Sequence, residues 1–417
     1  MKLFSEAYLS EEDRDLIGSQ SSRDPLGLMA IWSHFGRKII YNLTETSNHA
    51  MGFQLLIASL KMYEMFCVQE NKWVNQRNFF LLMEQYFAYS YALKNGPAEY
   101  PLPGKRALVG RPQEDYALSF QHKLLQGQLG NGVWGLFRGA AERSGLISFC
   151  EKKDVLCDDV SIEISEDDCK ILFNDIRKVM ENDIDLPLKK RTNARSRGGL
   201  FSSLSNILET LPQRELLREK LINKFPKQTI ISRIIKEEFF SPEIKYRDFI
   251  KAIRDEIEEP DLIQNIEEIE NCENYLAIIA SVFDYLCTMD GQSIDSVVNR
   301  TGRFLNLNKL TKAQKSFKQL PCNSNDTVRN RINMLGGEVI IATSFKECIQ
   351  TLVQYHEHLM EKRHNEAWIT IESNGVLVVS QKADPFEPDW NIGETWRHDY
   401  FFSSLRNIKR TLRREAS

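Results

Sequence analysis

The chain has 417 residues, of which 42% are hydrophobic and 27% charged, and its formal net charge is −4. This composition is ordinary for a globular protein of several domains, and it excludes a protein that attracts nucleic acid through a strongly basic overall field. The eight cysteines form no C-x-x-C pair, which argues against a structural zinc site and against a disulfide scaffold.

The N-terminal segment carries acidic residues where a signal peptide would have an apolar core. The chain has no apolar run of the ~18 residues that a membrane span needs, so we expect a cytoplasmic protein without membrane contact. Apolar residues at three- and four-residue spacing predict helices over 51–69 and 79–94, and prolines and glycines predict a loop over 96–112. Residues 1–110 are expected to form an N-terminal helical domain.

The stretch QLGNGVWGLFRGAAERSGLI (128–147) contains Gly130, Gly132 and Gly135 in the spacing G-x-G-x-x-G. A dinucleotide-binding loop needs a buried strand before the glycines and an acidic residue that ends a second strand about 20 residues later. Neither pattern is present. The glycines instead favour the turn of a helix–turn–helix.

The two helices of this motif are predicted over 114–129 and 133–143, and a further helix over 166–180. Residues 111–187 are therefore expected to form a winged-helix-like unit. Arg138 and Arg143 lie on its exposed side as candidate DNA-binding residues, although such units also serve as docking modules for proteins.

A basic linker is predicted at 188–200, where five positive charges precede two glycines. They are Lys189, Lys190, Arg191, Arg195 and Arg197. A segment with this charge can contact DNA phosphates in a salt-dependent manner, and a solvated linker is the alternative.

Residues 201–335 are expected to form a helical middle region, with helices over 204–225 and 261–288 and one that begins at Ser241-Pro242. The stretch 255–273 holds nine acidic residues and no basic one. Such a run is typical of a solvated face, and a surface for a basic partner is the alternative.

Residues 336–417 are expected to form a small α+β module, with a strand over 338–342, a helix over 345–362 and a β-hairpin around Asn374-Gly375. A final helix is predicted from about Asp399. On it an apolar stripe (Phe401, Leu405, Ile408 and Leu412) lies opposite four candidate DNA-binding cations (Arg406, Lys409, Arg410 and Arg413).

The cations of this helix suit DNA, an acidic partner or packing on their own domain. Trp390, Trp396, Arg397 and Tyr400 are candidate anchors of a partner interface, because Trp, Tyr and Arg concentrate binding energy. Packing against the hairpin is the alternative for these four residues.

The motifs of common enzymes do not occur. The sequence has no Walker A loop and no G-x-S-x-G elbow, and the E-x-K at Glu243-Ile244-Lys245 begins a helix rather than following a strand. On a helix His356 and His358 point about 200° apart and cannot share one metal ion, so solvated histidines are favoured. We therefore expect a protein that is not an enzyme, with no catalytic residue, cofactor or metal.

Three stretches resemble the accessory subunits of Lamassu-type bacterial systems for defence against phage and plasmids. They are DPLGLMAIWSHFGRKIIYNLTETSN (24–48), LLQGQLGNGVWGLFRGAAERSGLI (124–147) and WITIESNGVLVV with ETWRHDYFFSSLRNI (within 368–408). The resemblance does not extend to residues 200–330. It implies a non-catalytic role beside an SMC/Rad50-like ATPase and an effector nuclease, and no site residues carry over from it.

We therefore expect a mainly α, multidomain helical protein with a winged-helix-like unit and a small C-terminal α+β module. Its expected function is that of a scaffold or regulatory subunit in a DNA-targeting defence complex, with double-stranded DNA as a candidate partner. Two alternatives remain open: a stand-alone DNA-binding protein that uses the helix–turn–helix, and a divergent metal-dependent nuclease.

Overall fold

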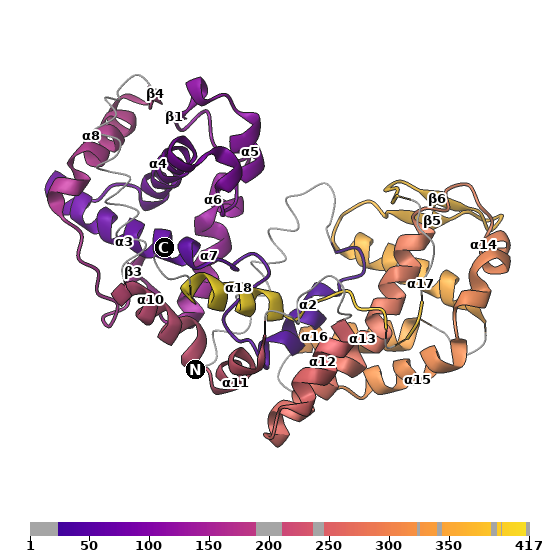
Figure 1. Cartoon of the computed structure of the whole chain (residues 1–417). Coiled ribbons are helices and arrows are strands. Elements are labelled where there is room, and N and C mark those ends of the chain that lie inside the picture. Colours follow the sequence, from indigo (N-terminus) through magenta and orange to yellow (C-terminus); the bar gives the residue numbers. More distant parts are fainter. Residues whose placement is uncertain are drawn as a thin grey trace. The chain divides into compact units, whose positions relative to one another are not determined.

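The computed structural model describes residues 24–188, 211–236, 246–322, 326–339, 344–384, 390–392 and 394–413, and these are mainly helical, as predicted (Figure 1). They form two compact units. Unit 1 contains the described parts of Met1–Ile39 and Ile234–Tyr400, and unit 2 those of Ile40–Arg233 and Phe401–Ser417. The sequence prediction divided the chain into consecutive modules, whereas each unit joins segments that are far apart in the sequence.

Two long helices form the centre of unit 2, α3 (Ala50–Glu70) and α4 (Gln76–Asn95). α3 is long and apolar enough to span a membrane by length and composition, but most of its apolar window is buried inside the protein. It is apolar around its whole circumference, which is the pattern of a helix covered on all sides. α4, α7 (Val133–Ser144), α8 (Glu166–Asn182) and α18 (Phe402–Arg413) pack against it.

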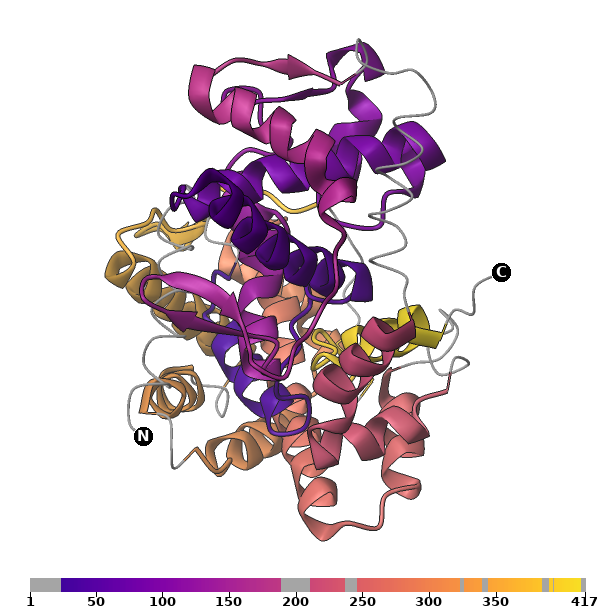
Figure 2. The same ribbon diagram turned by 90° about the vertical axis from the view of Figure 1, so that its left-hand side faces the viewer.

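The remaining elements of unit 2 are short. They are η1 (Pro97–Glu99), α5 (Lys105–Gly110), η2 (Gln113–Asp115), β1 (Ala117–Leu118), α6 (Gln128–Asn131), β2 (Ile147–Cys150), β3 (Lys153–Leu156), β4 (Leu186–Pro187), α10 (Leu211–Arg218), the π-helical turn η4 (Glu219–Asn223) and α11 (Pro226–Ile234). β1 pairs with β4 and β2 with β3, both antiparallel. Figure 2 shows the β2–β3 hairpin in magenta.

The predicted helix over 114–129 is wrong, and with it the first half of the helix–turn–helix. Only α6, of four residues, precedes α7 there. Gln85 of α4 holds the backbone of Ser119 in a non-helical form: its Nε2 donates to the Ser119 carbonyl at 2.8 Å, and its Oε1 accepts from the Ser119 N–H at 2.9 Å. The apolar spacing in this segment therefore reflects a buried loop, with Tyr116 and Leu118 in the core.

Unit 1 is built around α13 (Pro260–Leu286), whose second half is buried on all sides. Its other elements are α2 (Met29–Arg37), α12 (Tyr246–Asp255), α14 (Ile294–Thr301), η6 (Gly302–Phe304), α15 (Leu307–Lys318), α16 (Asp326–Glu338), α17 (Phe345–Lys362), β5 (Ile369–Ile371) and β6 (Leu377–Val379).

The predicted β-hairpin of unit 1 is confirmed. β5 pairs with β6 antiparallel, with Ile369 opposite Val379. Gly375 takes φ +80° in the turn, a conformation that favours glycine. The strand predicted over 338–342 is wrong at its first residue, because Glu338 ends α16. Residues 340–342 lie outside the described residues, and so does Ser241-Pro242, where a helix was predicted to begin.

Candidate nucleic-acid interface

α18 presents two chemically opposite faces, as predicted. Leu405, Ile408 and Leu412 are almost fully buried where the helix packs on α3, α10 and η4. The cations on the other side are Arg406, Lys409, Arg410 and Arg413, which fall within an arc of about 100° at the rotation per residue of an α-helix. The buried stripe fixes the rotation of the helix and so turns this arc away from the core.

Two further arginines border the arc. Arg218 of α10 donates through Nη2 to the carbonyl of Leu412 at 3.3 Å, which places it at the last turn of α18. Lys409 donates to the carbonyl of Ser232 on α11, and the exposed Arg233 follows directly. Figures 1 and 2 show α18, in yellow, beside α10. We call Arg218, Arg233, Arg406, Lys409, Arg410 and Arg413 the basic face.

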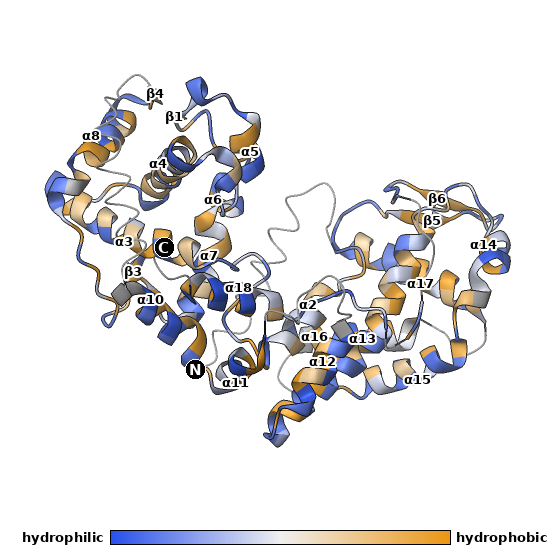
Figure 3. Cartoon of the chain, viewed as in Figure 1, coloured by the Kyte–Doolittle hydropathy of each residue, from blue (hydrophilic) through white to orange (hydrophobic). Residues whose placement is uncertain are grey.

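The basic face belongs to a strongly positive part of a chain that is negative overall. Residues 211–233 contain six Lys and Arg against two Glu, and residues 401–413 contain four Arg and Lys against no acid, which together give +8 in a chain of −4. Figure 3 shows blue, hydrophilic residues on α10 and α18. Like charges three and four residues apart on a helix repel each other, so the fold carries an electrostatic cost there that a bound polyanion would remove.

Sequence reasoning missed Arg218 and Arg233 because they reach α18 from segments about 180 residues earlier in the chain. The available signal was the i, i+4 spacing of Arg214 and Arg218 on an amphipathic helix, which predicts a basic stripe but not its neighbour. The five linker cations predicted to bind DNA, Lys189 to Arg197, lie outside the described residues.

The predicted DNA-binding arginines of α7 are engaged within unit 2. The Arg138 guanidinium forms an ion pair with the buried carboxylate of Asp154 at 2.8 Å. Arg143 donates through Nε and Nη2 to the carbonyl of Asn42, at 3.3 and 3.2 Å. Both side chains therefore brace α7 against its surroundings, and neither belongs to the basic face.

The glycine-rich turn before α7 holds a carboxylate of the chain itself. Glu84 of α4 accepts hydrogen bonds from the N–H of Val133, the first residue of α7, at 2.7 Å and from Gln128 Nε2 at 3.1 Å. A Cβ on Gly132 would lie 2.5 Å from both the Gln128 carbonyl oxygen and Glu84 Oε1 and closer still to Glu84 Oε2, and one on Gly135 would overlap the backbone of the preceding turn. Glu84 thus fills the place at the helix N-terminus where a dinucleotide loop would hold its pyrophosphate.

Burial raises the pKa of Glu84 to about 7, against the opposing effect of the hydrogen bonds from Val133 and Gln128. The buried carboxyl of Glu273, in unit 1, has its pKa raised to about 7 for the same reason. Both groups change charge near neutral pH, because the desolvation of a carboxylate is only partly offset by donors.

Glu273 joins three segments of unit 1. Its carboxylate accepts hydrogen bonds from the Tyr400 hydroxyl at 2.7 Å, from Trp32 Nε1 at 3.0 Å, and from the backbone N–H groups of Arg397 and His398. Tyr400 is fully buried. Hydrogen bonds from Tyr400 and from the Arg397 backbone therefore attach this segment to α13. The partner-interface role predicted for Tyr400 is wrong, because solvent does not reach its side chain.

The predicted tryptophan anchors also pack within unit 1. Trp390 is 2% exposed, and its ring centroid lies 5.6 Å from those of both Tyr285 and Phe345. Trp396 is half-buried, with its ring 6.4 Å from that of Tyr400. Trp390 is therefore a core residue, and the rings that it contacts belong to α13 and α17 rather than to the hairpin.

The acidic stretch 255–273 is partly neutralised inside unit 1. Its ion pairs are Glu256 with Lys236, Glu268 with Lys38 and Glu270 with Arg254, and farther along α13 Asp284 pairs with Arg397. The predicted solvated face is therefore wrong for Glu268 and Glu273, which are buried, while Glu256 is exposed.

His356 is a buried structural histidine rather than a solvated one. Its Nδ1 lies 2.8 Å from the Pro25 carbonyl oxygen, and its Nε2 accepts from the Trp368 N–H at 2.8 Å. Burial lowers its pKa to about 4, which keeps the ring neutral. Across the described residues, no three His, Cys, Asp or Glu side chains are grouped so that they could hold a metal ion.

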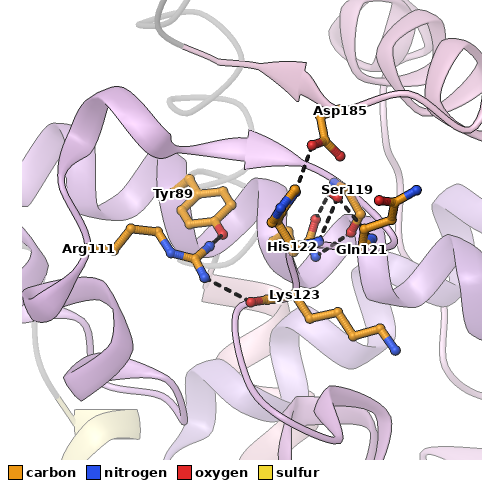
Figure 4. Close-up of polar contacts among 8 residues, drawn as sticks. Tyr89, Arg111, Ser119, Gln121, His122, Lys123 and Asp185 are labelled. Atoms are coloured by element: carbon orange, nitrogen blue, oxygen red, sulfur yellow. Dashed lines mark hydrogen bonds and ion pairs between the residues drawn. The ribbon is translucent and has the colours of Figure 1, made fainter.

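A second polar cluster joins the 119–124 loop to the residue before β4 (Figure 4). His122 Nδ1 lies 2.7 Å from Asp185 Oδ2, while the Ser119 oxygen accepts from the backbone N–H groups of Gln121 and His122 at 3.0 and 2.8 Å. Hydrogen bonds from Ser119 and His122 lower the pKa of Asp185. A nucleophilic triad needs the histidine ring between serine and acid, whereas here the buried Ser119 bonds the acid directly, so the cluster fixes a loop.

Comparison with protein-family models, with curated proteins and with solved structures gives no match to this chain. The functional argument therefore rests on the residues themselves. Of the predicted site residues that the structure describes, it brings together the four cations of α18 and adds Arg218 and Arg233 to them. A group of cations gathered on one face is suited to the phosphates of a nucleic acid.

Proposed function

We propose that this protein is a non-catalytic accessory subunit that holds DNA through its phosphate backbone. The observation that carries the proposal is the basic face of six cations, which lies on two segments, 211–233 and 401–413, with a combined net charge of +8. From Arg406 to Arg413 the cations extend over about 10 Å of helix, a length that faces about three phosphates of one strand. Contacts of this kind position a protein on DNA without reading its sequence.

The cellular role in the proposal comes from the resemblance to Lamassu-type accessory subunits. In that role the protein bridges an SMC/Rad50-like ATPase and an effector nuclease in the cytoplasm, and the basic face supplies the contact with DNA. The stand-alone helix–turn–helix reader is not proposed again, because its first helix is replaced by a loop. No arrangement of described residues favours the nuclease alternative.

The proposal is tested by fluorescence anisotropy with a labelled DNA duplex over a range of salt concentrations. The test variant replaces Arg233, Arg410 and Arg413 with alanine. The matched control replaces Lys309, Lys312 and Lys315, three exposed cations of α15 in unit 1. The salt dependence of log K should fall in magnitude by about 0.9 for each phosphate contact removed in the test variant, and the control should bind as the parent does.

Equal losses in both variants would mean that overall charge, rather than the basic face, determines binding. Binding by neither the parent nor the variants at low salt would end the proposal. The partner assignment has its own measurement, a tagged pull-down from the native host: an ATPase with long coiled coils in the eluate supports it, and recovery of the bare chain contradicts it.

A further inference from the structure

An exposed aromatic side chain lies in the same unit as the basic face. Tyr41 is 50% exposed, and its ring centroid lies 5.3 Å from that of Phe225, which with Lys224 links η4 to α11. Most aromatic rings of unit 2 are buried, and Tyr89, Tyr100 and Tyr116 are fully so. A half-exposed tyrosine that rests on a second ring offers a flat apolar surface to a ligand.

Hydrogen bonds of Asn42 hold the backbone beside Tyr41, and the Tyr41 ring itself rests on that of Phe225. Asn42 Nδ2 donates to the Ser144 hydroxyl at 2.9 Å and to the Leu221 carbonyl at 3.2 Å. The Asn42 carbonyl accepts both hydrogen bonds from Arg143. Ordering the ring in advance lowers the entropy lost when a ligand stacks on it.

The same contacts connect Tyr41 to the basic face. Leu221 lies in η4, directly after α10 with Arg218, and the Thr44 carbonyl accepts from the Ser404 hydroxyl of α18 at 2.8 Å. The segment that carries Tyr41 therefore contacts η4, which continues α10, and the buried side of α18, while the Tyr41 ring rests on Phe225 directly before α11.

A further cation flanks the aromatic pair. Lys224 Nζ lies 5.9 Å from the ring centroid of Phe225 and donates to the Ser144 carbonyl at 3.1 Å. Gly145, at φ +70°, makes room for it, because a Cβ there would lie 2.6 Å from Nζ. The stacking surface and a positive charge are thus side by side.

We propose that the basic face and Tyr41 together take single-stranded DNA, with phosphates on the cations and an unpaired base stacked on the Tyr41 ring. The inference rests on the proposed function and names the form of DNA. In a duplex the base faces are covered by their neighbours, so an exposed ring adds affinity only when a base is free to stack. Cations that track the backbone beside an aromatic surface are the general arrangement for single-strand binding.

The experiment compares a labelled thymidine 20-mer with a duplex of equal length by fluorescence anisotropy, using the parent chain, Tyr41→Ala and Tyr41→Phe. Tyr41→Ala should bind the single strand about tenfold more weakly and the duplex unchanged, while Tyr41→Phe should bind both as the parent does. An oligonucleotide with one 2-aminopurine reports stacking: its fluorescence should be quenched at saturation by the parent and by Tyr41→Phe, and less by Tyr41→Ala. Thermal unfolding of each variant checks that unit 2 remains folded.

The outcomes separate the two proposals. If Tyr41→Ala binds the single strand as tightly as the parent, or the parent prefers the duplex, the single-strand inference is overturned while the basic face stands. If the Arg233, Arg410 and Arg413 variant also binds both forms like the parent, the proposed function fails as well. Loss of single-strand affinity and of quenching in Tyr41→Ala alone supports the inference.

Discussion

Replacing Gly132 with alanine tests whether the glycine-rich turn exists to admit Glu84. The backbone of Gly132, at φ −96° and ψ −168°, is open to any residue, so the effect of the substitution is steric. The new Cβ would lie 2.5 Å from the Gln128 carbonyl oxygen and nearer to the Glu84 carboxylate, about 1 Å inside van der Waals contact. To relieve the overlap, Glu84, which is buried on all sides, must leave its place, and the backbone at Gln128 must shift as well.

The magnitude follows from the hydrogen bonds that Glu84 would lose. The Val133 N–H, at the start of α7, would lose its acceptor, which removes an N-terminal cap worth about 1 kcal/mol. A buried donor without a partner adds about 1–3 kcal/mol. We therefore expect Gly132→Ala to destabilise unit 2 by about 2–4 kcal/mol, which lowers its melting temperature by about 5–15 °C in a unit of this size.

Differential scanning calorimetry measures the shift, and the same motif supplies the control. A Cβ on Gly130 would meet no atom within 4 Å, so Gly130→Ala should leave the transition of unit 2 unchanged or raise it slightly through the better helix propensity of alanine. Equal melting temperatures for Gly132→Ala and Gly130→Ala would refute the placement of Glu84 at the start of α7.

Two predictions concern the pH dependence of unit 1. Glu273 has a folded-state pKa of about 7, above its usual 4.5, so its contribution to stability is complete below about pH 4.5 and is lost as the pH rises through 7. In Glu273→Gln, the fall in unfolding free energy from pH 5 to 7 should therefore be smaller by up to about 1.4 kcal/mol per pH unit. Urea unfolding at several pH values measures this slope, and a slope equal to that of the parent would contradict the prediction. His356 has a folded-state pKa of about 4, below its usual 6.5, so stability is lost as the pH falls from 6.5 to 4. His356→Phe should reduce this acid-side loss and destabilise unit 1 at pH 7 by about 2–4 kcal/mol, because the Pro25 carbonyl and the Trp368 N–H lose their partner; a variant as stable as the parent at pH 7 would show that those bonds contribute nothing.

The sequence predicts those helices whose apolar pattern matches their burial. α17 begins and ends at the predicted residues, and α3, α4, α7 and α18 lie within a few residues of their predicted bounds. In each case the pattern has a helical period because the helix packs on the core over that length. The hairpin around Gly375 was predictable for a local reason, since its turn needs a positive φ.

The features that the sequence did not predict depend on contacts between distant parts of the chain. Tyr116 and Leu124 keep a helical spacing of eight residues by coincidence: both are buried in a loop whose backbone is held by Gln85, a residue more than 30 positions away. The roles of Glu84 and Glu273 were not predicted. Glu84 stands in a strongly apolar helical segment, which is the one signal that marks an acid as buried, whereas Glu273 ends the acidic stretch 255–273 and has no such signal. The four cations of α18 could be predicted from the sequence of that helix. The two other arginines of the basic face could not, because they lie on α10 and α11, far away in the sequence.

The division of the chain has a consequence for how the protein is made. The polypeptide passes from one unit to the other after Ile39, again after Arg233 and again after Tyr400. During synthesis, unit 2 therefore cannot complete its core with α18 until every residue of unit 1 has been synthesised. A product that stops short of residue 401 would have all of unit 1 but neither the complete hydrophobic core of unit 2 nor four of the six cations of the basic face. Under the proposed function, only a chain translated through α18 can bind DNA, so a prematurely terminated chain should not bind it.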